Sequence, residues 1–236
     1  MGPTLLTTLS MGFLLGLVHA LEADHVMAVS TLVSQHRTLR RASTAGVFWG
    51  LGHTTALFLV GLLVIVFKIT IPQYIALYME FAVGVVLVAL GVSVVKGYIT
   101  GNVHAHAHQH DGVTHLHFHS HAGGEDHDHE HWSAHHGRSL LVGMVHGMAG
   151  SAALMLLVLA TIPKPLWGLL YILVFGAGSI LGMVCVSTAI GLPFLITVES
   201  HAPIHRWLRV GTGMASIAYG FFILTNVGFA QGLFRL

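Results

Sequence analysis

The chain has 236 residues, of which 54% are hydrophobic and 8% are charged, with a formal net charge of +1. Soluble domains carry about 25% charged residues, so this composition and a mean hydropathy of +0.78 exclude an ordinary soluble domain and predict a membrane protein. The near-zero net charge does not favour a nucleic-acid partner, and a single cysteine excludes an internal disulfide or a CxxC site.

Six apolar stretches are each long enough to cross a bilayer, which takes about 20 residues. We therefore expect an all-α, polytopic membrane protein with transmembrane helices at Leu5–Val33, Ala45–Phe67, Tyr74–Val95, Ser139–Thr161, Pro165–Leu192 and Trp207–Val227. The first stretch is too long for one perpendicular helix, as is the fifth if it continues through Val198, so a tilt or break is expected in each. Gly191-Leu192-Pro193 is the expected break in the fifth.

The charged residues between the stretches predict the orientation. With the N-terminus outside, seven basic residues fall on the cytoplasmic side and three on the outer side. The cytoplasmic set is Arg37, Arg40, Arg41, Lys96, Arg138, Arg206 and Arg209, and the outer set is Lys68, Lys164 and Arg235. This positive-inside bias predicts a multi-pass protein of the cytoplasmic membrane with both termini outside.

The chain also repeats itself. The segment from Gly16 to Ala20 resembles the segment from Gly143 to Gly147, at an offset of 127 residues that matches His19 to His146. The same offset matches Phe48 to Phe175 and Gly84 to Gly211. Because each unit would contain three spans, the two units must have opposite orientations. We expect a 3+3 inverted repeat, with residues 1–100 and 138–236 as the two units, and such repeats place a substrate site near the midplane.

The first stretch holds four ionisable residues within seven positions, namely His19, Glu22, Asp24 and His25. Each charge near the bilayer centre costs about 2.5–3.5 kcal/mol, so a function is expected for them. Imidazole nitrogens and carboxylate oxygens suit a divalent first-row metal. An unbroken helix would point His19, Asp24 and His25 in different directions. Either the helix unwinds here or a subset such as His19, Glu22 and His25 binds the metal together. The alternative to a metal site is a network of polar residues whose hydrogen bonds are satisfied within the helix bundle.

Two further histidines, His53 and His146, lie in apolar stretches beside small residues that let helices approach closely. Each is predicted to be a further metal ligand or a step along a path, with interhelical hydrogen bonding as the alternative. The repeat positions that match Asp24 and His25 carry Ser151 and Ala152. The first half should therefore carry most of the metal site, and the second half should form the opposing wall.

Residues 101–137 contain thirteen of the twenty histidines. With little apolar content this cytoplasmic loop should be disordered without metal. His-rich tracts bind metals, and the affinity should fall as the pH drops through about 6.5. A role in buffering, delivery or sensing is expected, because a flexible loop cannot shape a selective site. The predicted ligands in the loop are His104, His106, His108, His110, His115, His117, His119, His121, His127, His129 and His131.

Three segments resemble a known family. Val18 to His25 resembles the HX4DH signature of the nickel/cobalt transporter (NiCoT/NicO) superfamily, and Phe48 to Thr55 resembles its second signature. Gly143 to Ala152 is similar to the UreH-type urease accessory permeases of that superfamily. The resemblance implies secondary transport of Ni²⁺ or Co²⁺, with His19, Asp24 and His25 essential. Six spans in place of eight favour the accessory type, whereas the His-rich loop is similar to that of efflux members.

We therefore expect a permease with Ni²⁺ or Co²⁺ as its transported substrate, no tightly bound cofactor and no enzymatic activity, since neither a P-loop nor an HExxH motif occurs. The expected partners are the metal ion, the lipid bilayer, and metallochaperones or metalloenzyme maturation proteins. The alternative is a membrane metalloenzyme or a haem-binding electron carrier, for which His19, His53 and His146 could supply axial ligands.

Overall fold

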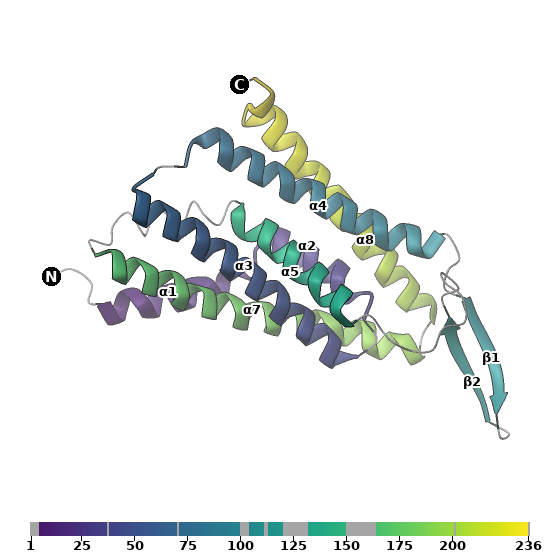
Figure 1. Cartoon of the computed structure of the whole chain (residues 1–236). Coiled ribbons are helices and arrows are strands. Elements are labelled where there is room, and N and C mark those ends of the chain that lie inside the picture. The colour runs from purple at the N-terminus through teal and green to yellow at the C-terminus, as the bar shows by residue number, and fades with distance from the viewer. Residues whose placement is uncertain are drawn as a thin grey trace.

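The computed structural model describes residues 5–36, 38–69, 71–99, 104–110, 113–119, 132–149, 164–200 and 202–235. Its helices and strands follow one another along the chain as coloured in Figure 1. They are α1 (Leu5–His19), α2 (Ala23–Val33), α3 (Leu39–Phe67), α4 (Gln73–Ile99), β1 (His104–His110), β2 (Val113–His119), α5 (Trp132–Met148), α7 (Pro165–Ser200), α8 (Ala202–Thr225), the π-helical η1 (Asn226–Ala230) and the 3₁₀ turn η2 (Leu233–Arg235).

The ends of the long helices follow local rules. Thr38 caps α3, because its side-chain oxygen accepts a hydrogen bond from the backbone N–H of Arg41 at 3.3 Å. The same helix ends at Lys68, which has the left-handed φ of 52° that terminates a helix. Pro165 occupies the first position of α7, where its missing N–H costs nothing.

The predicted spans agree in large part with the structure. In the described part of the chain, α3, α4, α7 and α8 are each long and apolar enough to cross a membrane, and α1 and α2 together form a fifth candidate bent by 55°. The expected break in the first stretch is therefore confirmed. The predicted span Ser139–Thr161 is described only as far as Ala149, and its remaining residues lie outside the described part.

The predicted break at Gly191-Leu192-Pro193 is wrong, because α7 continues through Pro193 to Ser200. Proline is tolerated inside membrane helices when neighbouring groups compensate for the lost backbone bond. Here Pro193 is on the exposed side. The carbonyl of Pro193 itself accepts a hydrogen bond from the Thr197 hydroxyl at 2.7 Å, one turn beyond the lost bond, which would have run from residue 193 to the carbonyl of Ala189. Gly191 packs against Ala42 and Val33, and this packing holds the helix on the bundle.

The helices pack in a regular way. α1 lies against α7, α5 against α3, α3 against α7, and α4 against α8, and Figure 1 shows α4 and α8 as an antiparallel pair. This pair contacts the other helices mainly through α2 and α7. Several contacts require glycine: for example, a Cβ on Gly52 would lie 2.1 Å from the backbone oxygen of Leu140, and one on Gly178 would lie 2.1 Å from that of Phe13. Glycine thus lets the helix backbones touch, as is common in membrane bundles.

Polar and apolar residues are distributed as in a membrane protein. The outside of the bundle carries exposed large apolar side chains such as Leu14, Leu63 and Phe222. The inside holds buried polar side chains, including four histidines and three serines, Ser179, Ser187 and Ser216. A soluble protein would not expose so large an apolar surface. We conclude that this is a helical membrane protein.

Within residues 101–137, for which disorder without metal stays a prediction, the structure describes two strands of seven residues each, β1 and β2. β1 and β2 form an antiparallel hairpin that stands apart from the helices in Figure 1, and α5 already begins at Trp132. Two local signals favour this hairpin. Histidine alternates with other residues at the period of two that is typical of strands, and the intervening Asp111-Gly112 is the dipeptide that favours a two-residue turn.

Candidate metal-binding site

The site begins at the break in the first apolar stretch. α1 ends at His19, a tight turn follows in which the backbone N–H of Glu22 donates to the carbonyl of His19 at 3.0 Å, and α2 starts at Ala23. Glu22 has an extended backbone, with φ −60° and ψ 146°. The 55° bend brings together histidine rings that a straight helix would have separated, and the His19 and His25 ring centroids lie 4.5 Å apart.

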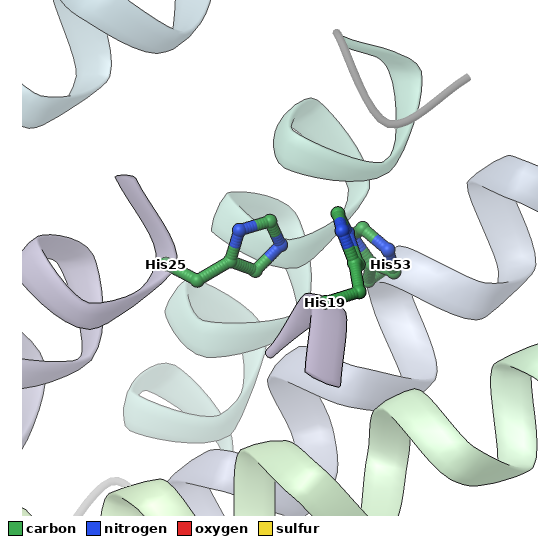
Figure 2. A group of neighbouring side chains, drawn as sticks. All are labelled: His19, His25 and His53. Carbon is green, nitrogen blue, oxygen red and sulfur yellow. The ribbon is translucent and has the colours of Figure 1, made fainter. Parts of the chain in front are cut away.

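Four histidines from four helices gather at this break, and we call them the four-histidine cluster: His19 of α1, His25 of α2, His53 of α3 and His146 of α5. The ring of His53 lies 5.1 Å from that of His19 and 5.2 Å from that of His25, and His146 lies 5.4 Å from His25. Figure 2 shows His19, His25 and His53 grouped at the junction of their helices. One nitrogen from each of these three lies within 4.8 Å of the others, close enough to share one metal ion.

Each ring except that of His53 is oriented by a hydrogen bond at Nδ1. His19 Nδ1 pairs with the Glu22 carboxylate at 2.7 Å, His25 Nδ1 with the Asp24 carboxylate at 3.0 Å, and His146 Nδ1 with the Val142 carbonyl at 3.1 Å. Asp24 also accepts a hydrogen bond from the backbone N–H of His25. With Nδ1–H as the donor, each ring keeps the Nε2 lone pair free, which is the arrangement that metal-binding histidines use.

The nitrogen atoms that remain are buried. Among the described residues, Nε2 of His19, His25 and His146 and both ring nitrogens of His53 have no hydrogen-bond partner. A buried polar atom left without a partner costs about 1–3 kcal/mol. His19, His25 and His53 each carry such an atom and also lie within reach of one ion, which favours a bound cation over a network of satisfied polar residues.

The carboxylates occupy the more open side of the site. The Asp24 side chain is 25% exposed and that of Glu22 is 43% exposed, whereas the His25 side chain is only 1% exposed. Glu22, Asp24 and His25 also form a second group whose potential ligand atoms lie within 4.8 Å of one another. The predicted residues are thus brought together, with buried imidazoles on one side and carboxylates that face a more accessible region on the other.

Two aromatic residues that sequence reasoning did not assign to the site form its walls. Trp49 stacks on His25 with ring centroids 5.4 Å apart and meets His146 edge-on at the same separation. Phe175 of α7 lies 5.6 Å from His19. The signal for Trp49 was its position four residues before His53, which puts both on one helix face.

The remaining predicted residues lie elsewhere. The histidines from His104 to His119 belong to β1 and β2, and His121, His127, His129 and His131 lie outside the described residues. Ser151 and Ala152 also lie outside the described residues. The prediction that the second half contributes only His146, which rests on these two positions, therefore stays a prediction. Cys185 is exposed and is no part of the site.

Comparison with known proteins gives one informative relative. The chain is 41% identical over 232 residues to a urease accessory protein UreH from Bacillus sp. (strain TB-90), and the match covers 98% of this chain and 96% of that protein. No protein-family model matches the chain. No solved structure matches it either.

Proposed function

This chain belongs to the family of the urease accessory protein UreH, and from that premise we propose that it is a permease for Ni²⁺ or Co²⁺ in the cytoplasmic membrane. The observation that carries the proposal is the four-histidine cluster, whose unpartnered nitrogens meet at a helix break inside a membrane bundle. Borderline first-row cations favour imidazole ligands. The relative is described as an accessory protein. This description supports the proposal that the chain assists an enzyme and is not itself an enzyme.

We propose further that the bundle is a six-helix, 3+3 inverted repeat. Moving the bounds of α1, α3 and α4 forward by 127 residues gives 132–146, 166–194 and 200–226, close to those of α5, α7 and α8. Matched helices run in opposite directions in Figure 1. Their contacts match too, because α1 packs on α7 as α5 packs on α3. Phe13 and Leu140, whose carbonyls approach the glycines described above, are 127 residues apart.

In this arrangement the ion would bind between the halves. His19, His25 and His53 come from the first half and form the binding group, and His146 of the second half faces His25 across the site. Inverted-repeat transporters expose such a midplane site to each side of the membrane in turn by moving one half against the other. A movement of α5 relative to the first half would change the contribution of His146 to ion binding, and with it the affinity for the ion.

The placement of basic residues supports the proposed orientation. Basic residues occur near the start of α3, α5 and α8 and near the end of α4, and in Figure 1 these helix ends lie on the same side of the bundle as the hairpin. They include Arg40, Arg41, Lys96, Arg138 and Arg206. Because cytoplasmic segments are enriched in lysine and arginine, we place this side in the cytoplasm and both termini outside.

The direct test is uptake of ⁶³Ni²⁺ into proteoliposomes that contain the purified protein. His19→Ala and Asp24→Asn should reduce the flux to the level of empty liposomes, because one loses a ligand and the other the charged partner of His25. His205→Ala is the matched control, since this histidine lies near the start of α8, where it pairs with Thr197 and not with the cluster. Unchanged flux in both site variants would refute the assignment.

The alternative of a haem-binding or electron-transfer protein is tested by absorbance. A Soret band in the purified protein would support it and contradict the permease. The similarity to an accessory protein gives this alternative no support. For the permease, accumulation of ⁶³Ni²⁺ or ⁵⁷Co²⁺ in intact cells measures both the preferred metal and the direction of transport. Co-purification tests whether metallochaperones or maturation proteins are partners.

A further inference from the structure

Trp49 of α3 contacts two rings of the four-histidine cluster. Its indole stacks on the His25 ring, with centroids 5.4 Å apart and planes 19° apart, and meets the His146 ring edge-on at 5.4 Å. Only 1% of the tryptophan surface is exposed. A Cβ on Gly143 of α5 would clash with the backbone oxygen and with Cδ1 of Trp49, so this glycine leaves the space that the indole occupies. The indole is therefore fixed between α2 and α5.

The stacking restricts the plane of the His25 ring. Rotation about the last side-chain bond of a histidine is soft, and the lone pair of its nitrogen lies in the ring plane. The hydrogen bond between Nδ1 and the Asp24 carboxylate limits this rotation, but that carboxylate is 25% exposed. The indole face fixes the plane from the buried side. It thereby keeps His25 directed so that one of its nitrogens lies within reach of those of His19 and His53.

The stacking also favours the state with an ion bound. An imidazole that binds a divalent ion carries part of the positive charge of that ion. The face of an aromatic ring is its negative side, and tryptophan attracts cations most strongly among the aromatic residues. The attraction between Trp49 and His25 is therefore stronger with the ion than without it. This difference contributes to the affinity for the ion and not only to the stability of the bundle.

The indole N–H gives a way to separate the ring face from the hydrogen-bond donor. Nε1 of Trp49 is buried and has no hydrogen-bond partner among the described residues. This nitrogen can only donate, so Trp49 cannot itself be a metal ligand. Phenylalanine offers an aromatic face without a buried donor, and leucine offers neither. If the ring face positions His25, phenylalanine should replace Trp49 and leucine should not.

We propose that Trp49 is a positioning residue for the transported cation, which acts by fixing the plane of the His25 ring and does not contact the ion. This role rests on the proposed function, because it takes the four-histidine cluster as the site of the cation. It adds a residue whose side chain has no metal-binding atom. Groups that orient a ligand contribute to metal affinity nearly as the ligands themselves do.

The experiment measures Ni²⁺ binding by calorimetry, and the visible absorption of bound Co²⁺, on the full-length protein in detergent. Trp49→Leu should lower the Ni²⁺ affinity by about 10–100-fold, the usual effect of losing an orienting group. It should also shift the Co²⁺ bands, because these depend on the directions of the ligands. Trp49→Phe should keep the affinity and the bands of the unmodified protein. Unchanged affinity and bands in Trp49→Leu, or equal losses in both variants, would overturn the proposal.

A second measurement leaves Trp49 in place and so does not depend on the folding of Trp49→Leu. The other three tryptophans, Trp132, Trp167 and Trp207, are replaced by phenylalanine. Ni²⁺ should then quench the remaining emission in step with the binding seen by calorimetry, because the indole stacks on a ring that binds the ion. Emission that stays constant while Ni²⁺ binds would refute the contact between Trp49 and the site.

The matched control is Trp207→Leu, since Trp207 of α8 is 70% exposed. We expect the affinity and the Co²⁺ bands of the unmodified protein. A loss here equal to that in Trp49→Leu would mean that removing any tryptophan disturbs binding, and would contradict the assignment to Trp49. Transport is measured separately: Ni²⁺ binding without ⁶³Ni²⁺ flux in the unmodified protein would refute the permease, and the two Trp49 variants would still decide the positioning role.

Discussion

Replacing Gly52 by alanine tests whether close helix packing holds the metal site in place. The new Cβ would lie 2.1 Å from the backbone oxygen of Leu140, whereas ordinary contact begins at 3.4 Å. A backbone atom cannot turn aside as a flexible side chain can, so α3 and α5 must separate by about 1.3 Å, the difference between these two distances. Overpacking of this kind costs about 1–3 kcal/mol.

The shift would act on the neighbouring residue, His53, which must stay near His19 and His25. Binding groups need to be held within about 0.5 Å of their working geometry, so a larger displacement should weaken Ni²⁺ binding by about 10–100-fold. We expect Gly52→Ala to lower both the thermal stability in detergent and the ⁶³Ni²⁺ flux in proteoliposomes.

The matched control is Gly97→Ala in α4, where a Cβ would meet nothing within 4 Å. Alanine is favoured over glycine in a helix by about 0.5–1 kcal/mol, so this variant should be as stable as the unmodified protein or slightly more so, with unchanged flux. Flux and stability that stay normal in Gly52→Ala would refute the reasoning, because the helices would then have room that the structure does not give them.

Three further outcomes are expected of the site. Glu22→Gln should lower Ni²⁺ affinity by about 10–100-fold in calorimetry, because the carboxylate that orients His19 is lost; equal affinity would contradict that role. His146→Ala should lower the affinity less than His53→Ala, since only His53 belongs to the group of three close nitrogens, and the reverse order would contradict this. Ni²⁺ at a hundred times its Kd should raise the free energy of unfolding by about 2.7 kcal/mol in thermal scans, and His25→Ala should abolish this rise.

Much of the bundle could be predicted from the sequence because the bilayer imposes a simple length rule. Apolar stretches of about 20 residues predicted the spans, and α3, α4, α7 and α8 agree with them. The break in the first stretch could also be predicted, since polar residues at membrane depth needed an irregular backbone. The break predicted from Pro193 was wrong, because α7 continues through it while Gly191 packs against Ala42 and Val33.

The His-rich loop carries sequence signals both for disorder and for the hairpin. Low apolar content favoured disorder, yet the alternation of histidine and the Asp111-Gly112 dipeptide were visible signals of two paired strands. Composition therefore outweighed periodicity in the prediction. The exact pairing of His106 with His117 follows from the turn length, so it is a local property that the sequence already contained.

The sequence by itself determined that this is a helical membrane protein with ionisable residues in its first span, because charge is rare and costly at that depth. Only the tertiary structure decided which of them meet. His53 and His146 join His19 and His25 because glycine contacts bring α3 and α5 close and because the chain bends after His19. The stacking of Trp49 on His25 likewise depends on a contact between residues that are far apart in the chain. The free Nε2 of His25 and of His146, by contrast, follows from local hydrogen bonds of Nδ1 to Asp24 and to Val142.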